Sequence, residues 1–101
     1  MEKEIELFYD EQMKEPIIGE ISFDPIMVGE KVEKSIYLYN KIGYKLETEI
    51  LLEGEYLSIK QDVKEINPKE TKELIILFEP KITLMKPIEA KLKIKLSYIV
   101  D

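Results

Sequence analysis

A regular alternation of apolar and polar residues near the end of the chain constrains the fold more than any other feature. In the segment IEAKLKIKLSYIV, residues 88–100, apolar side chains recur at every second position and mostly charged or polar ones stand between them. The apolar set that we expect to face a core is Ile88, Ala90, Leu92, Ile94, Leu96, Tyr98 and Val100. Because successive side chains of a strand point to opposite faces, this period predicts a β-strand and leaves little room for a helix.

A second apolar strand is expected in INPKETKELIILFEP, residues 66–80. It begins after a turn at Asn67, Pro68 and Lys69, because proline fixes φ and asparagine bonds its own backbone. It ends at Pro80, which cannot donate to a neighbouring strand. The inward set is Leu74, Ile76 and Phe78, and the outward pair is Ile75 and Leu77. Such a strand is typical of the centre of a β-sandwich.

Shorter alternating segments occur at 4–9, 17–23, 31–40, 44–53 and 56–60. Glycine, proline and asparagine residues separate them, and these residue types favour turns. The expected inward residues are Val32, Ile36, Leu38 and Asn40 in 31–40, and Tyr44, Leu46, Thr48, Ile50 and Leu52 in 44–53. Seven or eight short strands at this regular spacing predict an all-β sandwich or barrel.

Composition limits the classes of function. The chain has 101 residues, and we expect one domain over 1–101, with 1–16 as an N-terminal strand or arm. It contains no cysteine, histidine or tryptophan, and all 15 of its basic residues are lysine. A net charge of −6 without arginine is unlike a nucleic-acid-binding protein, which carries a basic face. We therefore expect no nucleic-acid partner and no disulfide bond.

The sequence gives little support for catalysis. Without histidine, the usual general base and the commonest metal ligand are missing. Asp10 with Glu11, and Asp24 with Glu20, offer carboxylates, but no calcium-binding loop of the required spacing surrounds them. The serines stand in no nucleophile motif. We predict that the protein is not an enzyme and has no catalytic residue, no cofactor and no metal site.

Two groups of residues in the middle of the chain resemble a known family. The residues that carry the resemblance are Phe23, Gly29, Ile36, Leu38 and Asn40 in the first half, and Pro68, Glu70, Leu74, Ile76, Phe78 and Pro80 in the second. In this order they resemble the immunoglobulin-like sandwiches of the major sperm protein and ASH (abnormal-spindle and hydin) type, over residues 19–96. The resemblance implies an all-β, immunoglobulin-like antiparallel β-sandwich of seven or eight short strands.

The same resemblance leaves one position of the sandwich open. If 31–40 is strand B and 71–79 is strand E, the segment 88–100 is strand F, and no later strand G follows it. The place beside strand F then needs another occupant. Two alternatives are expected: the N-terminal strand at 4–9, or a strand from a neighbouring chain that adds to the unpaired edge.

Two outer faces of the expected sandwich differ in character. Strands B and E are neighbours, and their outward residues Tyr37, Tyr39, Ile75 and Leu77 predict a protein-interaction patch. Two alternatives to this patch are that these residues only favour strands, or that the segment 1–18 folds over them. On strands C and F, a row of glutamates should lie near a row of lysines, as a solvated structural face. These rows are Glu47, Glu49 and Glu53, and Lys91, Lys93 and Lys95.

These observations predict a non-catalytic, structural protein-interaction module. By resemblance to small accessory proteins of bacteriophage particles, we expect a subunit of a larger assembly, such as a capsid decoration, neck or tail accessory protein. One alternative is a cytoplasmic adaptor that binds its partner by β-strand addition, and another is a carbohydrate-binding module. The chain has no secretory signal and no run of about 18 apolar residues, so we expect a virion or cytoplasmic location, no membrane contact, and a protein partner or a homo-oligomer.

Overall fold

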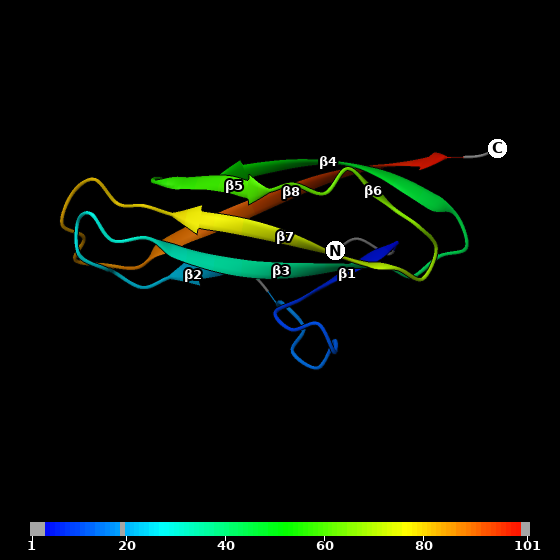
Figure 1. Cartoon of the computed structure of the whole chain (residues 1–101), viewed down its shortest axis with the longest axis horizontal. Helices are drawn as coiled ribbons and strands as arrows, with labels where there is room; N and C mark the ends of the chain where they lie inside the picture. The colour runs from blue at the N-terminus through cyan, green and yellow to red at the C-terminus, as the bar shows by residue number, and fades with distance from the viewer. Residues whose placement is uncertain (1–3, 19, 100–101) are drawn as a thin grey trace.

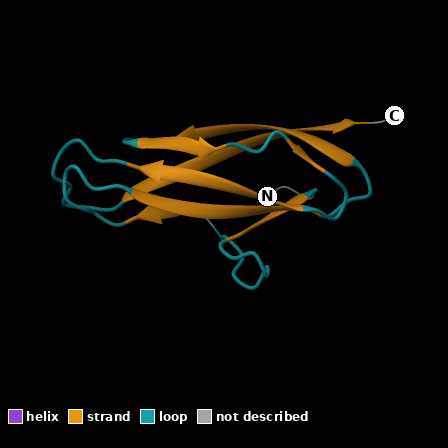
Figure 2. Ribbon diagram, in the orientation of Figure 1, coloured by secondary structure: helices purple, strands orange, loops and turns teal. Residues whose placement is uncertain are grey.

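The computed structural model describes residues 4–18 and 20–99. These residues form eight strands and no helix (Figure 2). The strands are β1 (Ile5–Phe8), β2 (Ile21–Phe23), β3 (Val32–Asn40), β4 (Lys45–Glu53), β5 (Leu57–Gln61), β6 (Glu65–Ile66), β7 (Thr71–Phe78) and β8 (Ile88–Ile99). Residues 1–3 of the expected N-terminal arm and the expected inward residue Val100 lie outside the described residues.

The strands form two antiparallel sheets of four, in the orders β1-β3-β7-β5 and β2-β8-β4-β6. They run along the long axis of the molecule, with connecting loops at both ends (Figure 1). This arrangement confirms the predicted all-β sandwich. The first sheet follows the A-B-E-D order of immunoglobulin domains, and β4 beside β8 corresponds to strand C beside strand F. The described part of the chain holds no helix that is long and apolar enough to cross a membrane.

The core is most completely packed where β3 pairs with β7. The inward side chains Ile36, Leu38, Leu74, Ile76 and Phe78 are all 0% exposed, as the alternation predicted. The Phe78 ring lies 5.3 Å from the ring of Phe23 on β2, so it joins the two sheets. Burying one such side chain contributes about 1.5–3 kcal/mol, which makes this pair of strands the centre of stability.

The inward residues of β4 also follow the prediction, with one exception. Leu46, Thr48 and Ile50 are buried, and Leu51 points outward. Tyr44 was expected inward but is 55% exposed, because β4 begins only at Lys45. Its ring instead stacks on Tyr98 of β8, with the ring centroids 5.9 Å apart. Tyr98 was also expected inward but is 54% exposed.

The N-terminal strand does not occupy the place beside β8, which was one of the two alternatives. β1 pairs with β3, with Ile5 opposite Asn40 and Phe8 opposite Tyr37, and this position buries Ile5 in the core. After a loop, Ile17 N–H donates to the Leu7 carbonyl at 2.9 Å, so the chain returns along the free side of β1. It then reaches the other sheet, where β2 pairs with β8.

The pairing between β2 and β8 is short. It joins Ile21 to Ala90 and Phe23 to Ile88, and it ends there. On its other side β8 pairs with β4 from Lys91 to Ile99. Within the described residues, β8 therefore has no strand on the β2 side over 91–99, and one edge of the sandwich stays open.

Candidate functional site

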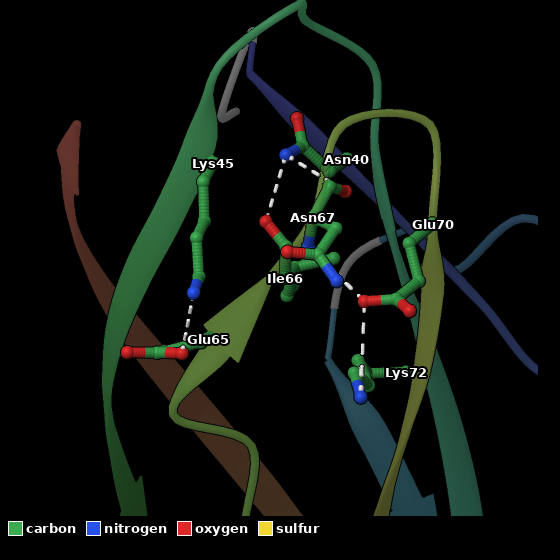
Figure 3. Close-up of polar contacts among 7 residues, drawn as sticks. All are labelled: Asn40, Lys45, Glu65, Ile66, Asn67, Glu70 and Lys72. Atoms are coloured by element: carbon green, nitrogen blue, oxygen red, sulfur yellow. Dashed lines mark hydrogen bonds and ion pairs between the residues drawn. The ribbon is translucent and has the colours of Figure 1, made fainter. Parts of the chain in front are cut away.

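A buried polar cluster lies where β3 ends, around the side chain of Asn40 (Figure 3). The Asn40 side-chain nitrogen lies 2.8 Å, 3.0 Å and 3.1 Å from the backbone carbonyls of Tyr44, Ile66 and Asn67. Its side-chain oxygen accepts the Ile42 N–H at 3.0 Å. Every polar atom of this side chain is thus used inside the fold, so Asn40 joins three segments and offers nothing to a ligand.

The turn before β7 continues this cluster. Glu70 N–H donates to the Asn67 carbonyl, and Asn67 N–H donates to the Glu70 carboxylate, both at 3.1 Å. This bond from Asn67, together with the charge of Lys72, holds the pKa of Glu70 below its ordinary value. Beside it, Lys45 and Glu65 form an ion pair at 3.0 Å (Figure 3). The arrangement fixes the turn and is a structural feature.

The described residues contain no arrangement suited to metal binding. No group of three or more acidic side chains in 4–18 and 20–99 could hold a metal ion. In the same residues, no buried side-chain nitrogen or oxygen lacks a hydrogen-bond partner. The structure thus points to surfaces, and three of them differ from an ordinary solvated face.

The first surface is the predicted patch on the outer face of β3 and β7. All four of its residues lie on that face and are partly buried. The register places a polar residue opposite each of them: Glu73 opposite Tyr37, Thr71 opposite Tyr39, Ser35 opposite Ile75, and Glu33 opposite Leu77. The structure therefore brings the four residues to one face, with polar side chains between them.

Tyr37 is held in place at this surface. Its hydroxyl donates to the Glu73 carboxylate at 3.2 Å, and partial burial followed by the Glu73 charge raises the pKa of Tyr37. Phe8 of β1 lies opposite Tyr37 and is only 7% exposed. Part of the segment 1–18 thus lies beside Tyr37.

The face of β4 and β8 matches the predicted ladder of charges. Glu49 lies opposite Lys95, and Glu53 lies opposite Lys91. The Lys93 ammonium is 3.1 Å from the Glu53 carboxylate, with both side chains largely exposed. Exposed pairs of this kind contribute about 0–1 kcal/mol each, so the ladder is a solvated structural face.

The second surface, here called the apolar end, was not anticipated from the sequence. It consists of Met27, Val28, Ile82 and Met85, with exposed fractions of 75%, 50%, 54% and 88%. These residues belong to the loops 24–31 and 79–87. Both loops extend from the same end of the sandwich, because Val32 pairs with Phe78 and Phe23 pairs with Ile88 (Figure 1, left). Apolar residues inside turn segments were the signal that could have found it.

A tight turn holds two of these side chains outward. Glu30 N–H donates to the Met27 carbonyl at 3.0 Å, and the Glu30 carboxylate accepts the Met27 N–H at 3.1 Å. Gly29 at the third position has φ of 94°, a conformation that other residues rarely adopt. The turn is thus fixed by its own hydrogen bonds, and within it Met27 and Val28 stay largely exposed.

The third surface is a groove of about 790 Å³ beside the open edge of β8. Leu92, Lys93 and Ile94 of β8 line one side of it. The lining of the other side comes mainly from β1 and the segment that follows its loop: Ile5, Glu6, Leu7, Pro16, Ile17 and Ile18, with Lys41 nearby. The groove therefore lies at the place where the two sheets are not joined.

Comparison with known proteins adds no family to this picture. No family model matches the chain, and no curated protein and no solved structure matches it either.

Proposed function

We propose that this protein is a non-catalytic protein-interaction module that serves as a structural subunit of a larger assembly. The single observation that supports this proposal most strongly is the apolar end. Met27, Val28, Ile82 and Met85 are each at least half exposed, although the surrounding surface is rich in charge. Exposed apolar side chains grouped at one end of a domain are typical of contact surfaces.

The chemistry of the apolar end favours a protein partner. Methionine is flexible and polarisable, so it adapts to the shape of a partner, and it is enriched in interfaces. Because the two loops extend from adjacent strands of a rigid sandwich, the partner would meet a surface with a fixed base and adaptable side chains. A contact of this type suits a protein that is incorporated in many copies.

The finer assignment follows from resemblance. The motif residues named above resemble sandwiches of the major sperm protein and ASH type, and small sandwich domains occur among bacteriophage accessory proteins. We therefore propose a role as a capsid decoration, neck or tail accessory protein. Its proposed location is the virion or the cytoplasm. The outer-face residues Tyr37, Tyr39, Ile75 and Leu77 are proposed as a second contact surface of the same subunit.

The test compares particle incorporation of three forms of the tagged protein in its source cells. The wild-type protein should sediment with large particles. The double variant Ile82→Glu with Met85→Glu should stay in the low-mass fraction, because charge at the apolar end opposes burial in a contact. The matched control is Leu51→Glu with Met13→Glu, which adds the same charge at exposed apolar residues elsewhere, and it should sediment like the wild type.

Two outcomes contradict the proposal. If the wild-type protein never leaves the low-mass fraction, it is not an assembly subunit under those conditions. If the Ile82→Glu, Met85→Glu variant sediments like the wild type, the apolar end is not the contact. A third pair, Tyr37→Lys with Leu77→Lys, then tests the outer face, and circular dichroism checks that each variant is folded.

A further inference from the structure

We infer that the groove beside β8 is an acceptor site for an extended peptide segment in which apolar and acidic residues alternate. The segment would lie antiparallel to β8 and add a strand to the β2-β8-β4-β6 sheet. This site is separate from the apolar end, so the inference does not depend on how that surface is used. Three features of the β8 edge support this inference: its unpaired backbone, its inward row of apolar side chains and its outward lysines.

The backbone of β8 is free on one side over most of its length. β4 uses the other side from Lys91 to Ile99, and β2 covers only Ile88 to Ala90. Every second residue of 91–99 therefore directs its N–H and C=O away from the sheet, with no strand there in the described part of the chain. An unpaired row of this kind is a template for strand addition.

The opposite edge of the groove is closed to such pairing. On the free side of β1, Phe8 forms a bridge with Pro16, and Ile17 already donates to Leu7. Proline has no N–H to offer, so this edge cannot extend its sheet at that point. A segment entering the groove would therefore pair with β8 and would use β1 and Ile17 as an apolar wall.

The inward row of β8 is only partly covered. Leu92, Ile94 and Leu96 belong to the core face, yet each keeps some exposure, whereas the corresponding residues of β7 have none. Leu92 and Ile94 line the groove, and so do Leu7 and Ile17 on the other side. An added strand would place every second side chain on this apolar surface, which requires apolar residues at those positions.

The outward lysines of β8 favour acidic residues at the outward positions of the added strand. Lys91, Lys93 and Lys95 are exposed on the outer face. Residues of an added strand would stand directly opposite them, and opposite charges attract there while like charges repel. Lys95 has no ion-pair partner within 4.0 Å in the described residues, and the Lys91 pair with Glu20 is long at 3.9 Å. Acidic side chains in the added strand would meet both.

The same lysines disfavour a second copy bound edge to edge. Antiparallel pairing of two β8 strands would set lysine against lysine along the outer face. Lysines on an exposed edge are a common protection against such self-pairing. The charge pattern therefore favours a different strand, acidic on its outer face, over another β8.

The test uses a synthetic peptide of about nine residues in which isoleucine and glutamate alternate, a length that spans the free edge at about 3.3 Å per residue. Its binding to the whole protein is measured by fluorescence anisotropy. A second peptide carries lysine in place of glutamate. We expect the acidic peptide to bind at least about tenfold more tightly than the lysine peptide, because of the charges opposite the β8 lysines.

A charge exchange sharpens the result. Lys93→Glu with Lys95→Glu should weaken binding of the acidic peptide about tenfold and strengthen binding of the lysine peptide. The matched control, Lys64→Glu with Lys86→Glu, changes the net charge equally at exposed lysines away from the groove and should leave the preference unchanged. Because the first variant also loses the Lys93–Glu53 pair, circular dichroism must show that it is folded.

Hydrogen exchange on the wild-type protein tests, without any variant, whether the peptide pairs with the β8 edge. The acidic peptide should slow exchange at alternate amides in 91–99 and leave the amides of β7 unchanged. Absence of binding, protection at another edge, or equal binding of both peptides would overturn the inference. So would a dimer in which these β8 amides are already protected without peptide, because the occupant would then be a second copy.

Discussion

β7 and β8 are both long strands with an apolar inward row, yet the fold covers these two rows differently. β7 lies between β3 and β5, and its inward residues Leu74, Ile76 and Phe78 are completely buried. β8 lies between β4 and the three-residue β2, and its inward residues Leu92, Ile94 and Leu96 keep partial exposure. Both inward rows carry three successive apolar side chains, so the difference shows that burial here is set by neighbouring strands on both sides.

The largest effect that distinguishes the two strands is the loss of one isoleucine side chain. Ile76→Ala should lower the free energy of unfolding by about 4 kcal/mol, since it opens a cavity in a fully packed core. Ile94→Ala makes the same chemical change on β8 and should cost only about 1–2 kcal/mol, because its side chain is partly solvated already. Urea unfolding measures both, and equal losses would show that β8 is covered in solution.

A second prediction compares a side-chain hydrogen bond near the start of β7 with one on β8. Asn40→Ala should cost about 3 kcal/mol, because it leaves buried carbonyls next to the start of β7 without a donor. The comparable hydrogen bond on β8 is exposed: the Tyr98 hydroxyl donates to the Glu4 carboxylate at 3.2 Å. Tyr98→Phe should cost less than about 0.5 kcal/mol by the same measurement. A small loss for Asn40→Ala would show that water replaces its hydrogen bonds.

The smallest effects come from two glutamates that respond to pH with opposite sign. The pKa of Glu70, before β7, is lowered by the Asn67 N–H, so ionised Glu70 stabilises the fold until the pH falls through its folded pKa. The pKa of Glu89, on β8, is raised by a hydrogen bond to Glu20 and by the Glu20 charge. Ionised Glu89 thus destabilises the fold, and this penalty disappears as the pH falls below the ordinary carboxyl pKa.

Unfolding midpoints from neutral pH to about pH 3 test this difference. Glu70→Gln should be less stable than the wild type at neutral pH, and Glu89→Gln should be more stable. Both differences should vanish in acid, where the carboxyl groups of the wild type are protonated. Changes of the same sign in the two variants at neutral pH would contradict the assignment.

The alternation in the sequence predicted the strands and their inward faces well. It placed Ile36, Leu38 and Asn40 on one face of β3, and it predicted the run from Ile88 as one long strand. Side-chain direction follows directly from the period of two, so local residues suffice for this part. The rows of charge on β4 and β8 were predictable for the same reason, once the two strands were taken as neighbours.

Strand neighbours and loop surfaces were harder to predict. The alternation in 4–9 suits a place beside β3 as well as one beside β8, and only packing of Ile5 in the core selects β3. The role of Asn40 depends on the carbonyls of Ile66 and Asn67, one distant segment that no local pattern shows. The apolar end depends on which turn positions face solvent, and Tyr44 was assigned inward because the start of β4 was placed one residue early.

The strand pairing also sets how this chain must fold. Phe23 pairs with Ile88, Ile5 with Asn40 and Lys45 with Ile99, so most pairs join residues far apart in the sequence. The chain therefore loses much entropy in closing long loops before native contacts repay it, and sandwiches of this kind fold in milliseconds to seconds. Until β8 pairs with β4, both edges of β8 are bare, and its row of lysines disfavours pairing with the β8 strand of another chain.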